Sequence, residues 1–158
     1  MEQSFADLQS FVAELGPVVS VLAVTVLGGI PFIESYFGTV LGALAGVPLP
    51  LALGAALVGN TAAVLVAGSL GGAIARRREG SATAVSSRRA RIVARTDKYG
   101  VPIASLLAPT VFAISLTTFI MTSVGYGRRR VIVWQIAAAV VWGAGMAAAF
   151  AGMSSLAP

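Results

Sequence analysis

Residues 31–50 read PFIESYFGTVLGALAGVPLP, and the interpretation of the whole chain depends on this stretch. It contains Glu34, which is the only charged side chain between Glu14 and Arg76. A charged residue at the centre of a membrane-inserted helix costs about 3 kcal/mol, so such residues are rare and usually functional. The position of Glu34 therefore indicates a functional site inside a membrane. The alternative is a structural acid that only caps backbone amides.

Prolines and glycines in the same stretch predict an irregular membrane segment. Pro31 comes shortly before the acid, and two more prolines close the stretch. Gly38, Gly42 and Gly46 recur at four-residue spacing, which brings one helix face close to a neighbouring backbone. Non-helical backbone is tolerated inside a bilayer only where protein or water covers it. We therefore expect residues 31–50 to form a re-entrant hairpin that enters the membrane and turns back.

The composition predicts an integral membrane protein with a single domain over residues 1–158. Of the 158 residues, 57% are hydrophobic and only 11% are charged, and the mean hydropathy is +0.89. A soluble domain of this size could not bury so much apolar surface. The net charge is +5. We assign it to membrane topology and lipid headgroups rather than to nucleic acid, because the basic residues flank apolar segments.

The chain contains neither cysteine nor histidine. Disulfides, thiol chemistry and metal sites built from thiolates or imidazoles are therefore excluded. A single acid within the apolar part cannot form an acid–base pair or a nucleophile–base pair in the bilayer. We expect no enzyme activity, no cofactor and no metal.

The remaining segments follow in chain order. Residues 3–15 have apolar residues at helical spacing, which predicts an amphipathic surface helix. Residues 17–30 predict a short first span, and residues 51–75 predict an uncharged span that contains Asn60. Residues 76–98 hold most of the basic side chains and predict a cytoplasmic loop. Residues 131–153 predict the last span.

A second basic cluster determines the expected topology. Arg128, Arg129 and Arg130 follow residues 99–127, which carry no charge and are interrupted by Pro109. If this cluster and the basic loop are both cytoplasmic, residues 99–127 enter and leave the membrane on the same side. We therefore expect a second re-entrant hairpin with residues 108–110 near its tip. The alternative is five plain spans, which would place the three arginines outside.

Two hairpins, each followed by a span, predict an all-α membrane protein with an inverted repeat. The two halves are residues 17–75 and 99–153, with the N-terminus inside and three crossings. Transporters with this plan bind substrate where the halves meet. The arginines at 128–130 are candidates for lipid headgroup binding at the cytoplasmic edge. The candidate residues for substrate or proton binding are Glu34, Ser35, Tyr36, Asn60, Pro109, Thr110 and Gln135.

Several motifs resemble a known family. They are FIESYFG at 32–38, LGAALVGNTAAV at 53–64, DKYGVPIASLLAPT at 97–110 and GYGRRRVIVWQIAAAVVWG at 125–143. Over nearly the whole chain these residues resemble the small multidrug export protein family of actinobacteria. More distantly, they resemble the DedA/VTT superfamily of lipid scramblases and undecaprenyl-phosphate flippases.

The resemblance implies a bacterial plasma membrane protein with two re-entrant hairpins in an inverted repeat. It implies that Glu34 is the acid of the first hairpin, and that Gly100 and Pro109 are the glycine and proline of the second. Gln135 and Trp142 lie where DedA proteins often have an asparagine and a tryptophan. The chain departs from DedA proteins around Pro109, where it has no arginine that could bind a lipid phosphate.

Three functions are compatible with these features. The first is a transporter of a small or amphiphilic substrate, in which Glu34 exchanges a proton for a cationic or polar molecule. The second is a lipid or undecaprenyl-phosphate translocase of the DedA type. The third is a membrane scaffold that transports nothing and assembles through the glycine face of residues 31–50. Expected partners are membrane lipids, a small-molecule or lipid substrate and a second copy of the chain.

Overall fold

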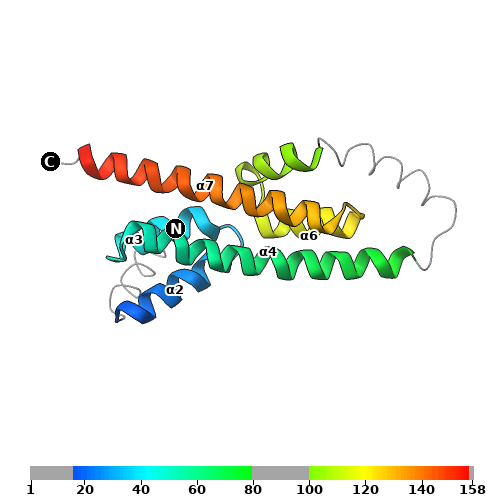
Figure 1. The fold of residues 1–158 in the computed structure, drawn as a ribbon, viewed down its shortest axis with the longest axis horizontal. Helices are drawn as coiled ribbons and strands as arrows, with labels where there is room; N and C mark the ends of the chain where they lie inside the picture. Colours follow the sequence, from blue (N-terminus) through cyan, green and yellow to red (C-terminus); the bar gives the residue numbers. More distant parts are fainter. Residues whose placement is uncertain (1–15, 80–99, 157–158) are drawn as a thin grey trace. The chain divides into compact units, whose positions relative to one another are not determined.

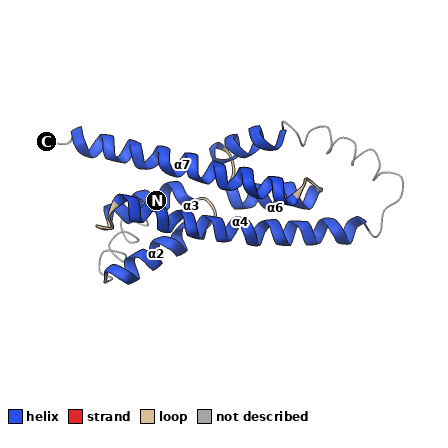
Figure 2. Ribbon diagram, viewed as in Figure 1, coloured by secondary structure: helices blue, strands red, loops and turns tan. Residues whose placement is uncertain are grey.

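The computed structural model describes residues 16–79 and 100–156, where the chain forms helices joined by short turns (Figure 1). The prediction of an all-helical chain is confirmed for this part, which contains no strand (Figure 2). The predicted surface helix 3–15 and most of the predicted loop 76–98 lie outside the described residues. The helices are α2 (Pro17–Gly29), α3 (Glu34–Leu44), α4 (Leu49–Glu79), α6 (Ile114–Val124), α7 (Arg128–Leu156) and a helix over Gly100–Thr110, whose last turn is the 3₁₀ helix η1 (Ala108–Thr110).

The same order of elements occurs twice along the chain. A short helix is followed by an 11-residue helix, α3 or α6, and then by a long helix, α4 or α7. Each 11-residue helix is followed by a glycine with left-handed backbone, Gly46 with φ +86° and Gly125 with φ +104°. In both places the next amide donates to the carbonyl five residues earlier, at 2.9 Å and 3.1 Å. This Schellman motif ends the helix, and glycine adopts the required conformation at low cost.

Contacts between Cα atoms divide the chain into two compact units. Unit 1 comprises Met1–Ala62 and Ala139–Pro158, so its described helices are α2, α3, the first part of α4 and the last part of α7. Unit 2 comprises Ala63–Ala138 and contains the rest of α4, the helix Gly100–Thr110, α6 and the first part of α7. Each unit therefore combines a pair of short helices with a segment of both long helices.

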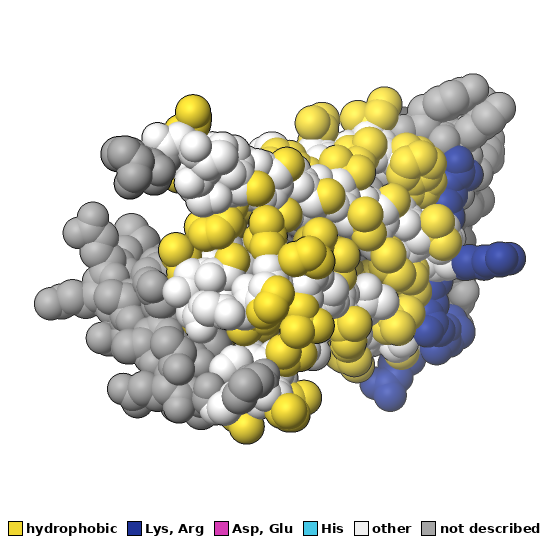
Figure 3. Space-filling view, turned by 60° about the vertical axis from the view of Figure 1, so that its left-hand side comes forward, with side chains coloured by type: hydrophobic (Ala, Val, Ile, Leu, Met, Phe, Trp, Pro, Cys, Tyr) yellow, Lys and Arg dark blue, Asp and Glu magenta, His cyan; other side chains and the backbone are white. Residues whose placement is uncertain are grey.

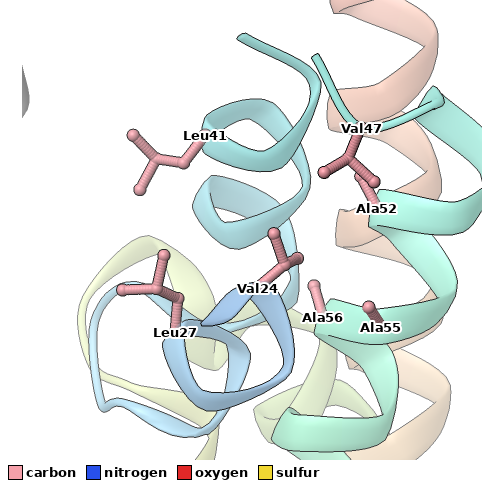
Figure 4. Close-up of a cluster of buried hydrophobic side chains, with 7 residues drawn as sticks. All are labelled: Val24, Leu27, Leu41, Val47, Ala52, Ala55 and Ala56. Carbon is pink, nitrogen blue, oxygen red and sulfur yellow. The ribbon is translucent and has the colours of Figure 1, made fainter. Parts of the chain in front are cut away.

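The core of unit 1 is a small cluster of aliphatic side chains. Val24 of α2 points toward the alanine-rich face of α4 (Figure 4). Because alanine extends little beyond the backbone, this face lets the neighbouring helices approach closely. The buried members of the cluster are Val24, Leu27, Leu41, Val47, Ala52, Ala55 and Ala56.

Glycines bring α2 and α4 into direct backbone contact. A Cβ atom built on Gly28 of α2 would overlap the backbone of Ala56 in α4. A Cβ atom built on Gly59 of α4 would overlap the carbonyl group of Thr25 in α2. Any larger residue at either position would push the two helices apart.

In unit 2 a glycine likewise brings two helices into direct contact. A Cβ atom on Gly71 of α4 would overlap the Thr122 hydroxyl and the Phe119 carbonyl of α6, so these helices also touch through a glycine. A second apolar cluster joins the helix Gly100–Thr110, α6 and α7. Its buried members are Val101, Met121 and Val131, with Tyr126 and Trp134 partly buried against them.

The first predicted hairpin has the wrong bounds. Residues 31–50 contain a turn, the helix α3, a second turn and the start of α4, so they do not form one hairpin. The paired helices are instead α2 and α3, which pack on each other and are joined at residues 30–33 around Pro31. Gly38 and Gly42 do face α2 and α4, whereas Gly46 lies in the turn beyond α3. Gly46 therefore does not continue the packing face of Gly38 and Gly42, because the helix ends before it.

The second predicted hairpin covers the helix Gly100–Thr110, a turn at 111–113 and α6. Residues Ala108–Thr110, expected near the tip, form η1 immediately before the turn. Pro109 has no amide hydrogen, so it cannot make the bond that would continue a regular helix. The Ala108 carbonyl instead accepts hydrogen bonds from the amides of Val111 at 2.9 Å and Phe112 at 2.7 Å.

Two of the described helices are long and apolar enough to cross a membrane: Leu49–Arg77 within α4, and Arg128–Leu156. They contain the predicted spans 51–75 and 131–153. The helix α2 has 13 residues and is about 20 Å long, which is shorter than the hydrocarbon core of a bilayer. Residues 17–30, predicted as a short first span, thus contain a short apolar helix, and their crossing of a membrane stays a prediction.

Large apolar side chains lie on the outside of the helices, as Figure 3 shows for one face. Val26 of α2 is 66% exposed and Val58 of α4 is 63% exposed. Only 33% of the most apolar window of each long helix is buried within the chain. The core helix of a soluble protein is mostly buried, and exposed apolar surfaces of this kind are typical of sites that contact lipid or another protein.

Candidate functional site

Glu34 is the first residue of α3 and is 1% exposed. Glu34 and Phe32 have left-handed φ angles of +50° and +72°, which residues with a side chain rarely adopt. Such strain costs on the order of 1–3 kcal/mol per residue and is concentrated at functional sites. The Ile30 carbonyl closes the turn by accepting hydrogen bonds from the amides of Ile33 at 3.2 Å and Glu34 at 3.0 Å. The strained turn therefore sets the position of the buried acid.

The Glu34 carboxyl group has a tyrosine as a neighbour. The Tyr36 hydroxyl forms a side-chain hydrogen bond with it, and the Tyr36 side chain is itself buried. The first turn of a helix also favours a negative charge, because the peptide dipoles leave partial positive charge there. Both effects stabilise an acidic group at this place in the fold.

Ser35 joins three helices of unit 1. Its hydroxyl donates a hydrogen bond to the Ala139 carbonyl of α7 at 2.8 Å. It also accepts a hydrogen bond from the side-chain nitrogen of Asn60 in α4 at 3.3 Å. Ser35 and Asn60 are fully buried. Gly143 of α7 lies beside Ser35, since an added Cβ there would be in van der Waals contact with the Ser35 side chain at 3.4 Å.

Four of the predicted site residues therefore lie in unit 1. Glu34, Ser35 and Asn60 are buried, and hydrogen bonds connect Ser35 to Asn60 and Tyr36 to Glu34. The side-chain oxygen of Asn60, Oδ1, is buried and has no hydrogen-bond partner. This is a polar site in a unit whose other packing is almost entirely apolar.

The other predicted residues, Pro109, Thr110 and Gln135, belong to unit 2. The Thr110 side chain is exposed, and its hydroxyl donates to the Leu107 carbonyl of its own turn at 2.6 Å. Gln135 is fully buried, and its side-chain nitrogen contacts the Met121 sulfur at 3.7 Å. The side-chain oxygen Oε1 of Gln135 has no hydrogen-bond partner.

Ser105 is a buried polar residue that was not predicted. Its side chain is fully buried, and its hydroxyl has no hydrogen-bond partner. The sequence indicates its burial only through spacing, because Ser105 follows the buried Val101 by four residues and so lies on the same face of the helix. By contrast, the buried hydroxyls of Thr118 and Thr122 donate to carbonyls of α6 itself.

The two basic clusters meet in unit 2. The Arg128 guanidinium donates to the Ser69 hydroxyl of α4 at 2.9 Å. A Cβ atom on Gly72 of α4 would lie 3.5 Å from the Arg128 side chain and 3.6 Å from that of Arg76. The end of α4 and the start of α7 therefore lie side by side.

An open pocket of about 480 Å³ lies at the start of α7. Its wall combines three arginines with an indole and an aliphatic side chain. The lining residues are Gly127, Arg128, Arg129, Arg130, Val133 and Trp134. The surface of the pocket is nearly all apolar, so the arginines contribute the aliphatic parts of their side chains beside Trp134 and Val133.

Known proteins add no assignment for this chain. No family model, no curated protein and no solved structure matches it. Within residues 16–79 and 100–156, no group of three acidic, histidine or cysteine side chains could hold a metal ion.

Proposed function

We propose that this protein is a membrane transporter of a small or amphiphilic substrate, with Glu34 in its binding site. The observation that carries the proposal is the burial of Glu34 at the strained start of α3, beside the Ser35–Asn60 hydrogen bond. An acid that served only stability would not need two left-handed residues in its turn. Strain of this kind is instead found where a protein must change between two conformations.

The apolar exterior supports a membrane location. The two long apolar helices would cross the bilayer, and the short helix pairs would be the re-entrant hairpins of an inverted repeat. The repeated order of elements and the two glycine motifs support such a repeat. The proximity of Arg76 and Arg128 supports placing both basic clusters on the cytoplasmic side. The resemblance to the small multidrug export and DedA/VTT proteins is compatible with this arrangement.

Transport requires that the buried site opens. Glu34, Ser35 and Asn60 are at most 1% exposed, so a substrate reaches them only when part of the surrounding structure moves, and the proposed moving part is the strained turn at 30–33. Phe32 and Glu34 hold strain that such a movement would release. A proton and a cationic substrate would compete for the Glu34 carboxylate. On the described helices of unit 1, Tyr36 is the only other titratable side chain.

The test is cation uptake by proteoliposomes with an acidic interior, using ethidium as the probe. Protons leaving through the transporter would drive ethidium inward, so vesicles with the native protein should accumulate it above protein-free vesicles. The Glu34→Gln variant keeps a polar side chain of the same size but cannot exchange a proton, so accumulation should be lost. Native-like elution and helix content would show that the variant is folded.

Glu79→Gln is the matched control, because it makes the same change in an acid at the end of α4. It should accumulate ethidium like the native protein. Equal accumulation by Glu34→Gln would contradict a transport role for Glu34.

The pocket at the start of α7 favours a second candidate function, lipid translocation. The exposed Arg128 and Arg129 suit an anionic headgroup, and the apolar wall of the pocket suits an apolar chain. Movement of fluorescent phosphatidylglycerol between leaflets of proteoliposomes would test it. Arg129→Ala should slow this movement severalfold, and unchanged movement would contradict the role of the pocket.

The scaffold function has less support. Gly38 and Gly42, the residues expected to form an assembly surface, pack against α2 and α4 of the same chain.

A further inference from the structure

We infer that the substrate of the proposed site is a cation that carries an N–H group, and that Asn60 selects for this group. The inference rests on the proposed function and specifies its substrate class. It starts from Asn60 Oδ1, a buried hydrogen-bond acceptor that has no hydrogen-bond partner.

The direction of the hydrogen bonds fixes the orientation of the Asn60 side chain. The Ala139 carbonyl can only accept, so the Ser35 hydroxyl must use its single hydrogen to donate to it. The Ser35 oxygen must then accept a hydrogen bond from Asn60, and only the amide nitrogen can donate one. Turning the amide over would place two acceptors against each other. The fold therefore forces Asn60 to present its oxygen elsewhere.

The neighbouring side-chain donors are used within the chain. The Thr39 hydroxyl donates to the Ser35 backbone carbonyl, and the Tyr36 hydroxyl is bonded to Glu34. What the site offers to a ligand is therefore the amide oxygen of Asn60, in the same unit as the Glu34 carboxyl group. A buried amide that lacks one of its hydrogen bonds is destabilising, and an apolar residue of similar size would avoid this cost. A ligand that donates a hydrogen bond would remove it.

Charge distribution specifies the ligand further. All Lys and Arg residues of the chain lie in unit 2, and the sequence of unit 1 contains none. A ligand bound to unit 1 therefore meets the Glu34 carboxyl group and no basic side chain of that unit. A protonated amine provides both a positive charge and an N–H donor for Asn60. A quaternary ammonium ion provides the charge but no donor.

The test compares two probes that differ in one substituent on nitrogen, a hydrogen in one and a methyl group in the other. Benzyldimethylammonium is protonated at neutral pH and has one N–H, whereas benzyltrimethylammonium has none. Their binding to the purified full chain in detergent would be measured by titration calorimetry. The native protein should bind the first probe on the order of tenfold more tightly, the value expected for one charge-assisted hydrogen bond.

Three variants assign the preference to Asn60. Asn60→Leu should bind the two probes with equal affinity. If that variant does not fold, Ser35→Ala serves instead, because it frees the amide to rotate and should reduce the preference severalfold. Thr118→Val removes a buried hydroxyl of unit 2 that bonds only within its own helix, and it should keep the full preference.

Equal binding of the two probes by the native protein, or an unchanged preference in the folded Asn60 or Ser35 variant, overturns the inference. The proposed function would survive either result if ethidium uptake still depends on Glu34. Binding of neither probe also overturns the inference, and absent ethidium uptake in addition would overturn the proposed function.

Discussion

Replacing Gly59 by alanine should destabilise unit 1, because this glycine lies at the contact between α2 and α4. Its added Cβ would overlap the Thr25 carbonyl oxygen, and would lie 2.8 Å from the carbonyl carbon and 2.9 Å from the Gly29 nitrogen. These are backbone atoms, so no side-chain rotation can relieve the overlap, and α2 must move away. Overpacking of this kind costs about 1–3 kcal/mol, and the cost is at the upper end where backbone must move.

Helix propensity acts in the opposite direction. Alanine is favoured over glycine inside a helix by about 1 kcal/mol. We therefore expect Gly59→Ala to lower the free energy of unfolding by about 1–2 kcal/mol. For a chain of this size the Tm would fall by about 2–8 °C.

Gly54→Ala is the matched control on the same helix. A Cβ atom on Gly54 meets nothing within 4 Å, so only the propensity term remains and the Tm should rise by a few degrees. Thermal unfolding in detergent can be followed by tryptophan fluorescence, since the chain has two tryptophans. A Tm of Gly59→Ala equal to or above that of Gly54→Ala would refute the close contact between α2 and α4.

Two further predictions concern the turn and the topology. Phe32 is 57% exposed with φ +72°, so Phe32→Gly should relieve strain without loss of core packing and raise stability by about 1 kcal/mol; a Tm no higher than that of Phe32→Ala would argue against strain in this turn. A membrane-impermeant thiol reagent on intact cells should label Ser154→Cys but not Gly127→Cys, because the proposed second hairpin returns to the cytoplasm. Labelling of Gly127→Cys from outside would instead make residues 99–127 an ordinary span.

The long helices were predictable from sequence because their signal is local. The predicted spans 51–75 and 131–153 lie inside α4 and α7, where uninterrupted apolar residues favour a helix of membrane-spanning length. The bounds of the first hairpin were not predictable in the same way. Pro31 marks an interruption, but its sequence does not show whether the chain turns there or begins a new segment. In the structure the turn lies around Pro31, and α2 and α3 pack against each other.

The site was partly predictable for the same reason. Glu34 and Asn60 are rare polar residues in apolar segments, and this alone identified them. The acceptor for the Ser35 hydroxyl is a backbone carbonyl of Ala139, more than a hundred residues away. Every residue has a carbonyl, so no sequence pattern indicates which one is used.

The sequence by itself determined that the chain is helical and apolar, where its charges lie and which acid is exceptional, because composition and periodicity act over neighbouring residues. Tertiary structure alone decided that Gly28 and Gly59 form a helix contact, that Phe32 and Glu34 adopt left-handed backbone and that Asn60 presents an oxygen. These features arise where helices distant in the chain meet. Hydrogen-bond direction and backbone overlap exist only after the helices have packed.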